Sequence, residues 1–228
     1  MNWSWILPEG FSTVSGDIDA LYYLILWITG IVFFGTEGLL LYLIFRYRHK
    51  EGRQAAHDHG STKMEIAWTL VPLVIVIGLG IASKGVWDTV KVDVPSGGYE
   101  IIVTARQFEW IVTYPGPDGA LGTADDFDTL NEMHVAEDRP VVITLRSDDV
   151  LHSLFLPQMR IKQDAIPGKD ITVWFEAVQP GDYDIGCAEL CGTGHTTMNG
   201  SLTVYTAADF AAWAAAQAQQ QQQQQPQP

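Results

Sequence analysis

The sequence predicts a chain of two parts, in which an N-terminal hairpin of two transmembrane helices precedes an all-β sandwich or barrel. Two long apolar runs in the first third of the chain indicate the hairpin. Short segments rich in valine, isoleucine, threonine, tyrosine and phenylalanine, separated by turn residues, indicate the β part. The hydrophobic period therefore changes from helical to strand-like after about Lys84.

The first apolar run covers residues 21–45, and the second, residues 66–82, contains no charged residue. A helix of about 20 apolar residues crosses the roughly 30 Å of hydrocarbon in a bilayer. We therefore predict transmembrane helices over residues 21–45 and 65–84, after an N-terminal segment of residues 1–20.

The segment between the two predicted helices, residues 46–64, holds five of the six lysines and arginines that precede residue 90. Because short basic loops stay in the cytoplasm, we expect this loop to be cytoplasmic and the N-terminus and β part to lie on the outer side. We expect no cleavable signal peptide, since the first run follows Asp17 and Asp19 rather than a basic region. The chain is thus predicted to be an integral membrane protein.

The predicted β part covers residues 91–206 and contains five strand-like segments, at residues 99–114, 141–145, 171–175, 181–185 and 201–205. Proline-glycine and asparagine-glycine pairs separate them, which favours a sandwich or barrel. Residues 207–228 are predicted to add a short helix, at 207–213, and a disordered glutamine-rich tail.

An aspartate-rich insertion, residues 115–131, interrupts the β pattern. Oxygen-rich loops with glycine can bind calcium, but this spacing does not match the EF-hand and lacks its closing glutamate. We interpret the insertion as a solvated hairpin loop and keep a metal site as the alternative.

The formal net charge is −14, and most of the 27 acidic residues follow the second apolar run. Such a surface repels nucleic acid and steers a basic partner, with association rates that fall as salt rises. The alternative is ordinary solubilising charge.

Residues with metal-binding side chains gather near the C-terminal end of the β part, with one histidine upstream. They are Cys187, Glu189, Cys191, His195, Met198 and the upstream His152. Thiolate, imidazole and thioether groups suit copper far better than calcium or magnesium. The succession of cysteine, histidine and methionine is typical of blue copper proteins, and a second cysteine lets two copper ions share both sulfurs.

Two other interpretations of these residues stay open. A disulfide between Cys187 and Cys191 fits an oxidising compartment, but it explains neither His195 nor Met198, and so short a loop gains little from a crosslink. A zinc site is the second alternative, and the methionine counts against it.

The run from Cys187 to Met198, with Val-Leu-His-Ser around His152 and Gln-Asp-Ala-Ile-Pro-Gly at residues 163–168, resembles subunit II of the haem-copper cytochrome c oxidases. In that family an outer cupredoxin domain holds the binuclear CuA centre. The likeness spans both predicted membrane helices and the whole β part. It implies two copper ions held by His152, Cys187, the Glu189 carbonyl, Cys191, His195 and Met198. It also implies that the Glu189 side chain binds magnesium at the interface with subunit I.

A second match, residues 63–72, resembles the start of the family's second membrane helix. Glu65 then stands where relatives place a glutamate near the mouth of a proton channel into subunit I. The alternative is an ordinary glutamate at a helix start, favoured by the helix dipole. Glu37, inside the first apolar run, is expected to face a neighbouring helix or subunit.

A third match, residues 105–110, is similar to the aromatic segment through which these oxidases receive electrons. Phe108 stands where many relatives carry tryptophan, and Glu109 replaces a common aromatic residue. Electrons could therefore enter through Phe108 or Trp110. Alternating aromatic residues on a strand are also common in a β core. His134 has no place in the copper pattern and is expected in a strand.

The resemblance implies a subunit that passes electrons from an outer-side cytochrome c to the haem of subunit I, where oxygen is reduced to water and protons are translocated. Subunit I and subunit III are the expected partners, in a prokaryotic plasma membrane. The chain has no Cys-x-x-Cys-His haem motif, so we expect a separate and basic cytochrome c.

Two alternative functions stay open. The small copper-bearing subunit of a nitric oxide reductase shares this architecture, although Glu65 favours the oxygen-reducing branch. A membrane-tethered copper-binding or copper-delivery protein would need no enzyme partner, whereas Glu37 within an apolar helix favours an obligate neighbour.

Overall fold

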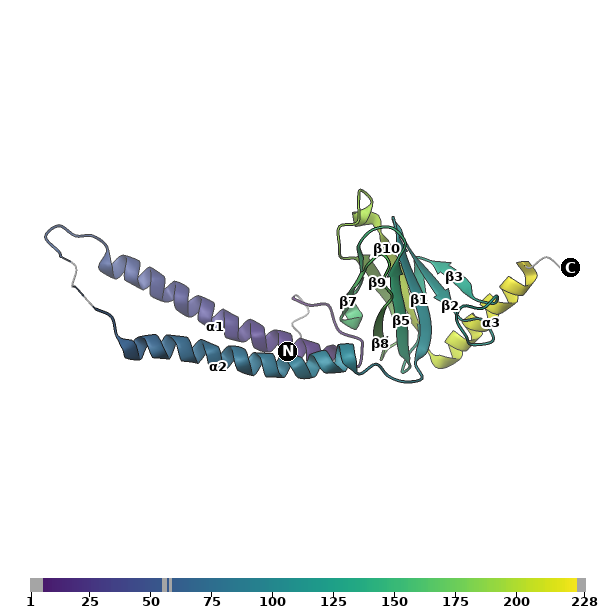
Figure 1. Cartoon of the computed structure of the whole chain (residues 1–228), viewed down its shortest axis with the longest axis horizontal. Helices are drawn as coiled ribbons and strands as arrows, with labels where there is room; N and C mark the ends of the chain where they lie inside the picture. The colour runs from purple at the N-terminus through teal and green to yellow at the C-terminus, as the bar shows by residue number, and fades with distance from the viewer. Residues whose placement is uncertain (1–5, 55–56, 58, 225–228) are drawn as a thin grey trace. The chain divides into compact units, whose positions relative to one another are not determined.

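The computed structural model describes residues 6–54, 57 and 59–224. The chain forms two compact units, a helical unit of Asp17–Asp88 and a β unit made of the rest of the chain, including the N-terminal segment up to Gly16 (Figure 1). The predicted fold class, a pair of apolar helices followed by an all-β sandwich, is confirmed. The last four residues of the predicted glutamine-rich tail lie outside the described residues.

The helical unit contains α1 (Ser15–Tyr47) and α2 (Thr62–Trp87), and a turn of π-helix (Asp88–Val92) follows α2. Both helices are long and apolar enough to cross a membrane. No residue of α2 is buried, and Ser15 is the one buried residue of α1. Because apolar side chains face outward all around these helices, lipid or another protein must cover them.

The β unit consists of two five-stranded sheets (Figure 1). The first has the order β3-β2-β1-β5-β8, and the second has the order β4-β10-β9-β6-β7. The strands are β1 (Tyr99–Arg106), β2 (Glu109–Tyr114), β3 (Phe127–Leu130), β4 (Glu132–Ala136), β5 (Pro140–Ser147), β6 (His152–Leu156), β7 (Ile161–Ala165), β8 (Ile171–Glu176), β9 (Gly181–Cys187) and β10 (Asn199–Tyr205). Two pairs, β1 with β5 and β4 with β10, are parallel, and the other pairs are antiparallel.

Alternation along the strands builds the core of the β unit. In β5, every second residue is buried, namely Val141, Ile143, Leu145 and Ser147. Successive side chains of a strand point to opposite faces, so such a strand buries one face and exposes the other. Ile101 and Val103 of β1 continue this buried layer. The core lies between the two sheets.

The five predicted strand-like segments all lie in strands, and residues 99–114 form the β1–β2 hairpin. The sequence pattern did not predict β3, β6 or β7, and for β4 it predicted only that His134 lies in a strand, which is confirmed. In β7, the sequence Ile-Lys-Gln-Asp-Ala has little strand propensity of its own. It becomes a strand because it pairs with β6 over its whole length. The aspartate-rich insertion ends in β3, which pairs with β2.

The N-terminal segment packs on the β unit. The Phe11 amide donates to the Gln158 carbonyl over 2.8 Å, and the Val178 amide donates to the Phe11 carbonyl over 2.9 Å. The Ser12 hydroxyl donates to the Met159 carbonyl over 2.8 Å, and Ser12 is buried. The sequence gives no strand signal in this segment, so it did not predict that the segment packs on the β unit.

The C-terminal helix α3 (Ala207–Gln224) begins with a cap in which the Asp209 amide donates to the Thr206 hydroxyl over 3.2 Å. The helix continues through part of the glutamine run that the sequence predicts to be disordered. Alanine and glutamine both have high helix propensity, which accounts for this extension. Trp213 anchors the helix by stacking on His134, with ring centroids 4.5 Å apart.

The stability of the β unit should depend on the charge of His134. Burial lowers the pKa of His134 from its ordinary value of 6.5, and Glu132 opposes this shift only in part. The unfolded chain therefore binds the proton more readily, so the contribution of neutral His134 is complete above about pH 6.5 and is lost as the pH falls below it. We expect the thermal midpoint, followed by near-ultraviolet circular dichroism, to drop from pH 7.5 to 5.5. The drop should be smaller in His134→Gln, and an equal drop in both proteins would contradict the prediction.

Candidate metal centre

The loop between β9 and β10 carries most of the candidate ligands. Cys187 is the last residue of β9, and Met198 immediately precedes β10. His195 opens a short 3-10 turn, His195–Thr197. Because β9 and β10 pair directly, both ends of this loop are held by the sheet. His152 begins β6, which pairs with β9 on its other side, with Leu154 opposite Cys187.

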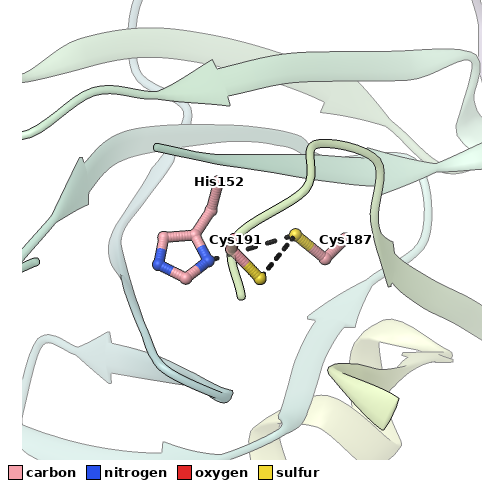
Figure 2. A group of neighbouring side chains, drawn as sticks. All are labelled: His152, Cys187 and Cys191. Carbon is pink, nitrogen blue, oxygen red and sulfur yellow. Dashed lines mark hydrogen bonds between the residues drawn. The ribbon is translucent and has the colours of Figure 1, made fainter. Parts of the chain in front are cut away.

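The side chains of His152, Cys187 and Cys191 point toward one another (Figure 2). The Cys187 Sγ atom lies 3.8 Å from the Cys191 Sγ atom and 4.0 Å from His152 Nδ1. The Cys191 Sγ atom lies 3.7 Å from both His195 Nδ1 and Met198 Sδ. The backbone oxygen of Glu189 lies 3.2 Å from Cys187 Sγ. All six predicted ligand residues therefore converge on the sulfur pair.

These spacings fit a metal site. A tetrahedral metal with sulfur at about 2.3 Å and nitrogen at about 2.0 Å holds its donor atoms roughly 3.5–3.8 Å apart. A disulfide would instead bring the two sulfurs to about 2.05 Å. Both cysteines are free thiols in this structure. The donor set of soft sulfur and imidazole nitrogen selects copper over magnesium or calcium.

One side of the site is shielded from solvent, and the other side is accessible to solvent. His152 and Met198 have no exposed surface, and Cys191 is buried, whereas Cys187 and His195 are half-buried. Burial and the neighbouring Cys187 sulfur raise the pKa of the Cys191 thiol to about 11. A metal that binds the Cys191 sulfur as a thiolate must therefore displace its proton.

Asp149 orients His152, a role that the sequence did not reveal. Its carboxylate lies 2.8 Å from His152 Nε2, which leaves Nδ1 facing the sulfurs. It also accepts hydrogen bonds from the Gln107 and Val150 amides, at 2.7 and 2.6 Å. Partial burial raises the pKa of Asp149, but these hydrogen bonds outweigh it and hold the pKa below its ordinary value. Such a carboxylate fixes the ring orientation of a metal-binding histidine.

The two aromatic candidates occupy different positions. Phe108 is half-buried, and its ring lies so close to the ligand loop that a Cβ atom on Gly194 would come within 2.5 Å of it. Trp110 is fully buried, and its ring centroid lies 6.2 Å from that of His152. Phe108 therefore connects the surface with the loop, and Trp110 packs in the core behind His152.

The remaining predicted site residues lie elsewhere. Glu65 lies in the first turn of α2, in the helical unit. In the aspartate-rich insertion, Asp125 and Asp126 accept hydrogen bonds from neighbouring groups of the same loop, including the Asp118 and Gly122 amides. Within the described part of the chain, His152, Cys187 and Cys191 form the one cluster of histidine, cysteine or acidic side chains with metal-site spacing.

Comparisons with known proteins match both parts of the chain. The family model of the cytochrome c oxidase subunit II transmembrane domain matches residues 1–86, and that of the subunit II periplasmic domain matches residues 107–204. An alternative cytochrome c oxidase subunit 2 from Bradyrhizobium diazoefficiens is 33% identical over 240 residues, which cover 93% of this chain and 84% of the relative.

A cytochrome c oxidase subunit 2 from Synechocystis is 27% identical, over 92% of this chain and 75% of the relative. Among solved structures, the periplasmic domain of cytochrome oxidase subunit II from Bradyrhizobium japonicum is 29% identical. It aligns over 56% of this chain and 98% of that domain, with a TM-score of 0.49.

Replacing Asp149 with alanine should weaken copper binding, because His152 loses the carboxylate that orients it. Changes of this kind typically cost about 10- to 100-fold in metal affinity. Competition between the full-length chain and a copper chelator measures the effect. The control is Asp148→Ala, which removes an equally charged and exposed neighbour whose carboxylate lies outside these contacts. Equal affinities for the two variants would rule out this role.

Proposed function

This chain belongs to the subunit II family of cytochrome c oxidases, and from that membership we propose that its β unit holds a binuclear CuA centre that relays electrons from cytochrome c to subunit I. The resemblance predicted from the sequence is confirmed. The chain is therefore a subunit of a respiratory oxidoreductase, with a copper-binding cupredoxin-like domain and two membrane helices. As an oxidase subunit, it associates with other subunits of the complex.

The observation that carries the proposal is the pair of sulfurs 3.8 Å apart with an imidazole beside each one. His152 lies beside Cys187, and His195 lies beside Cys191. Both thiolates and both imidazoles would hold two copper ions as strong donors, with Met198 and the Glu189 carbonyl as weak donors.

Two copper ions bound here would supply one-electron transfer. The protein contributes rigidity and exclusion of water. Three paired strands hold the ends of the ligand segments, and the fully buried His152 and Met198 close the inner side of the site. A preformed and largely dry site lowers the reorganisation that each electron transfer requires.

Electrons enter, in this proposal, through Phe108 rather than Trp110. Phe108 reaches the surface and touches the ligand loop, which supports this choice, whereas the buried Trp110 is inaccessible to a donor protein. The donor is a basic cytochrome c, which the formal net charge of −14 on this chain supports. Haem in subunit I would supply the reduction of oxygen to water, coupled to proton translocation.

The proposal also assigns roles to the membrane helices and to the contact with subunit I. Glu65 collects protons for a channel into subunit I, which its position in the first turn of α2 supports. The Glu189 side chain binds magnesium at the contact with subunit I, while its carbonyl faces the copper site. Subunits I and III cover the apolar faces of α1 and α2. The β unit then lies on the periplasmic side of a prokaryotic plasma membrane.

The copper pair has a direct spectroscopic test. The full-length chain in detergent, loaded with copper, should bind two copper ions and give a seven-line electron paramagnetic resonance spectrum. The reason is that one unpaired electron is shared equally by two copper nuclei. Cys191→Ser should abolish the seven-line pattern. A four-line spectrum with one copper ion in the unmodified chain would refute the CuA proposal and favour a copper carrier.

Electron uptake should depend on Phe108. Phe108→Leu should slow reduction by a basic cytochrome c, measured by stopped-flow absorbance, while copper content and spectrum stay unchanged. The control is Phe127→Leu, because Phe127 is also half-buried but stacks on Tyr114 and contacts Trp213 of α3. Equal reduction rates in the two variants would show that electrons do not enter through Phe108.

A further inference from the structure

The turn between β1 and β2 contacts both chain segments that supply the copper ligands. The side-chain amide of Gln107 donates a hydrogen bond to the Cys191 carbonyl, with Nε2 and oxygen 2.6 Å apart. The backbone amide of the same residue donates to the Asp149 carboxylate over 2.7 Å. One surface residue therefore reaches the ligand loop through its side chain and the His152 segment through its backbone.

The bond to Cys191 falls where the loop has little other support. At the beginning of the loop, the Ala188 amide donates to the Ser153 carbonyl of β6. In its second half, the amides of His195 and Met198 donate to carbonyls of the loop itself, those of Gly192 and His195. Gln107 supplies a link to another element at the middle of the loop, on the residue that carries a bridging sulfur.

The ligand loop packs so closely on the turn between β1 and β2 that two of its residues have no room for a Cβ atom. A Cβ atom on Gly192 would lie 2.7 Å from Gln107 Nε2, and one on Gly194 would lie 2.5 Å from the Phe108 ring. Real Cβ atoms almost never approach other atoms so closely. The two glycines of the Cys-Gly-Thr-Gly-His run thus permit the contact between the loop and residues 107–108.

The backbone hydrogen bond of Gln107 leads through Asp149 to His152, on the other side of the site. Asp149 accepts the Gln107 amide with one carboxylate oxygen and faces His152 Nε2 with the other, 2.8 Å away. His152 begins β6 and Cys191 lies in the loop between β9 and β10, so neighbouring positions in sequence cannot fix their separation. Gln107 links them because it donates one hydrogen bond to the Cys191 carbonyl and one to the Asp149 carboxylate, which in turn faces His152.

We propose that Gln107 is a positioning residue that holds Cys191 and His152 in the geometry required by the copper pair. This inference rests on the proposed CuA function and extends it to a residue that touches no copper ligand atom. Loss of the side-chain donor frees the Cys191 carbonyl and lets residues 191–194 shift. The electronic structure of the site then changes while the fold of the sandwich persists.

The test uses the full-length chain, loaded with copper, with two substitutions at Gln107. Gln107→Glu keeps the size of the side chain and the backbone bond to Asp149 but removes the amide donor. Gln107→Ala removes the side chain entirely. The matched control is Gln158→Ala, which deletes a glutamine amide that donates to Asp184 over 3.2 Å, beyond the end of β6 opposite to His152. Copper affinity, visible absorption, the paramagnetic spectrum and the thermal midpoint are measured for each protein.

We expect both Gln107 variants to lose about 10- to 100-fold in copper affinity, the range typical of residues that orient metal ligands. Their copper hyperfine splitting and absorption bands should shift, and Gln158→Ala should match the unmodified chain. If Gln107→Ala fails to fold, Gln107→Glu decides the matter, because it preserves the packing.

A Gln107→Glu protein with unmodified affinity and spectra would overturn the proposal, as would a lowered thermal midpoint with unchanged spectra. Failure of the CuA function itself is distinguishable. In that case the unmodified chain would already lack the seven-line spectrum.

Discussion

The pairing of β9 with β6 on one side and β10 on the other is the constraint on which the metal site depends. It places Leu154 opposite Cys187, so His152, two residues before Leu154, points to the same face of the sheet as the cysteine. The β9–β10 pair also holds both ends of the ligand loop. A slip of one residue in either register would turn ligands to the opposite face. The buried core between the sheets prevents such a slip, since it would expose apolar side chains.

The same geometry explains why the site favours a cation. The Cys191 thiol resists ionisation, because its burial and the Cys187 sulfur 3.8 Å away both raise its pKa. A bound cation reverses this preference because it stabilises both thiolates at once. The imidazoles present Nδ1 to the sulfurs, and Asp149 fixes that choice for His152. The sandwich thus provides a preformed site in which both sulfurs can lie side by side as thiolates only when a metal ion stabilises their charge.

The sequence predicted those parts of the fold and site that are encoded locally. The ligand residues from Cys187 to Met198 lie in one short run, and β1, β5 and β8 are rich in β-branched and aromatic residues. The sequence did not reveal β7, whose polar residues form a strand because β6 pairs with them. It also missed Asp149 and the contact of Gln107 with Cys191. The contact of Gln107 with Cys191 arises where the packing of the two sheets brings two loops together, and no spacing rule in the sequence connects residues so far apart. Asp149 lies only three residues before His152, but the sequence gives no sign that its carboxylate faces the imidazole ring.

The two units of the chain obtain their stability from different sources. The β unit has a continuous buried core. All the metal-site residues, together with Gln107 and Asp149, lie in this unit. In the described parts of α1 and α2, apolar side chains are exposed on every face, and Glu37 lies among them. A carboxylate at that depth is costly in lipid, so a neighbouring polar group is the favourable environment for it. Substitutions in the helices should therefore affect assembly with other subunits more than copper binding, and substitutions around Gln107 should do the reverse.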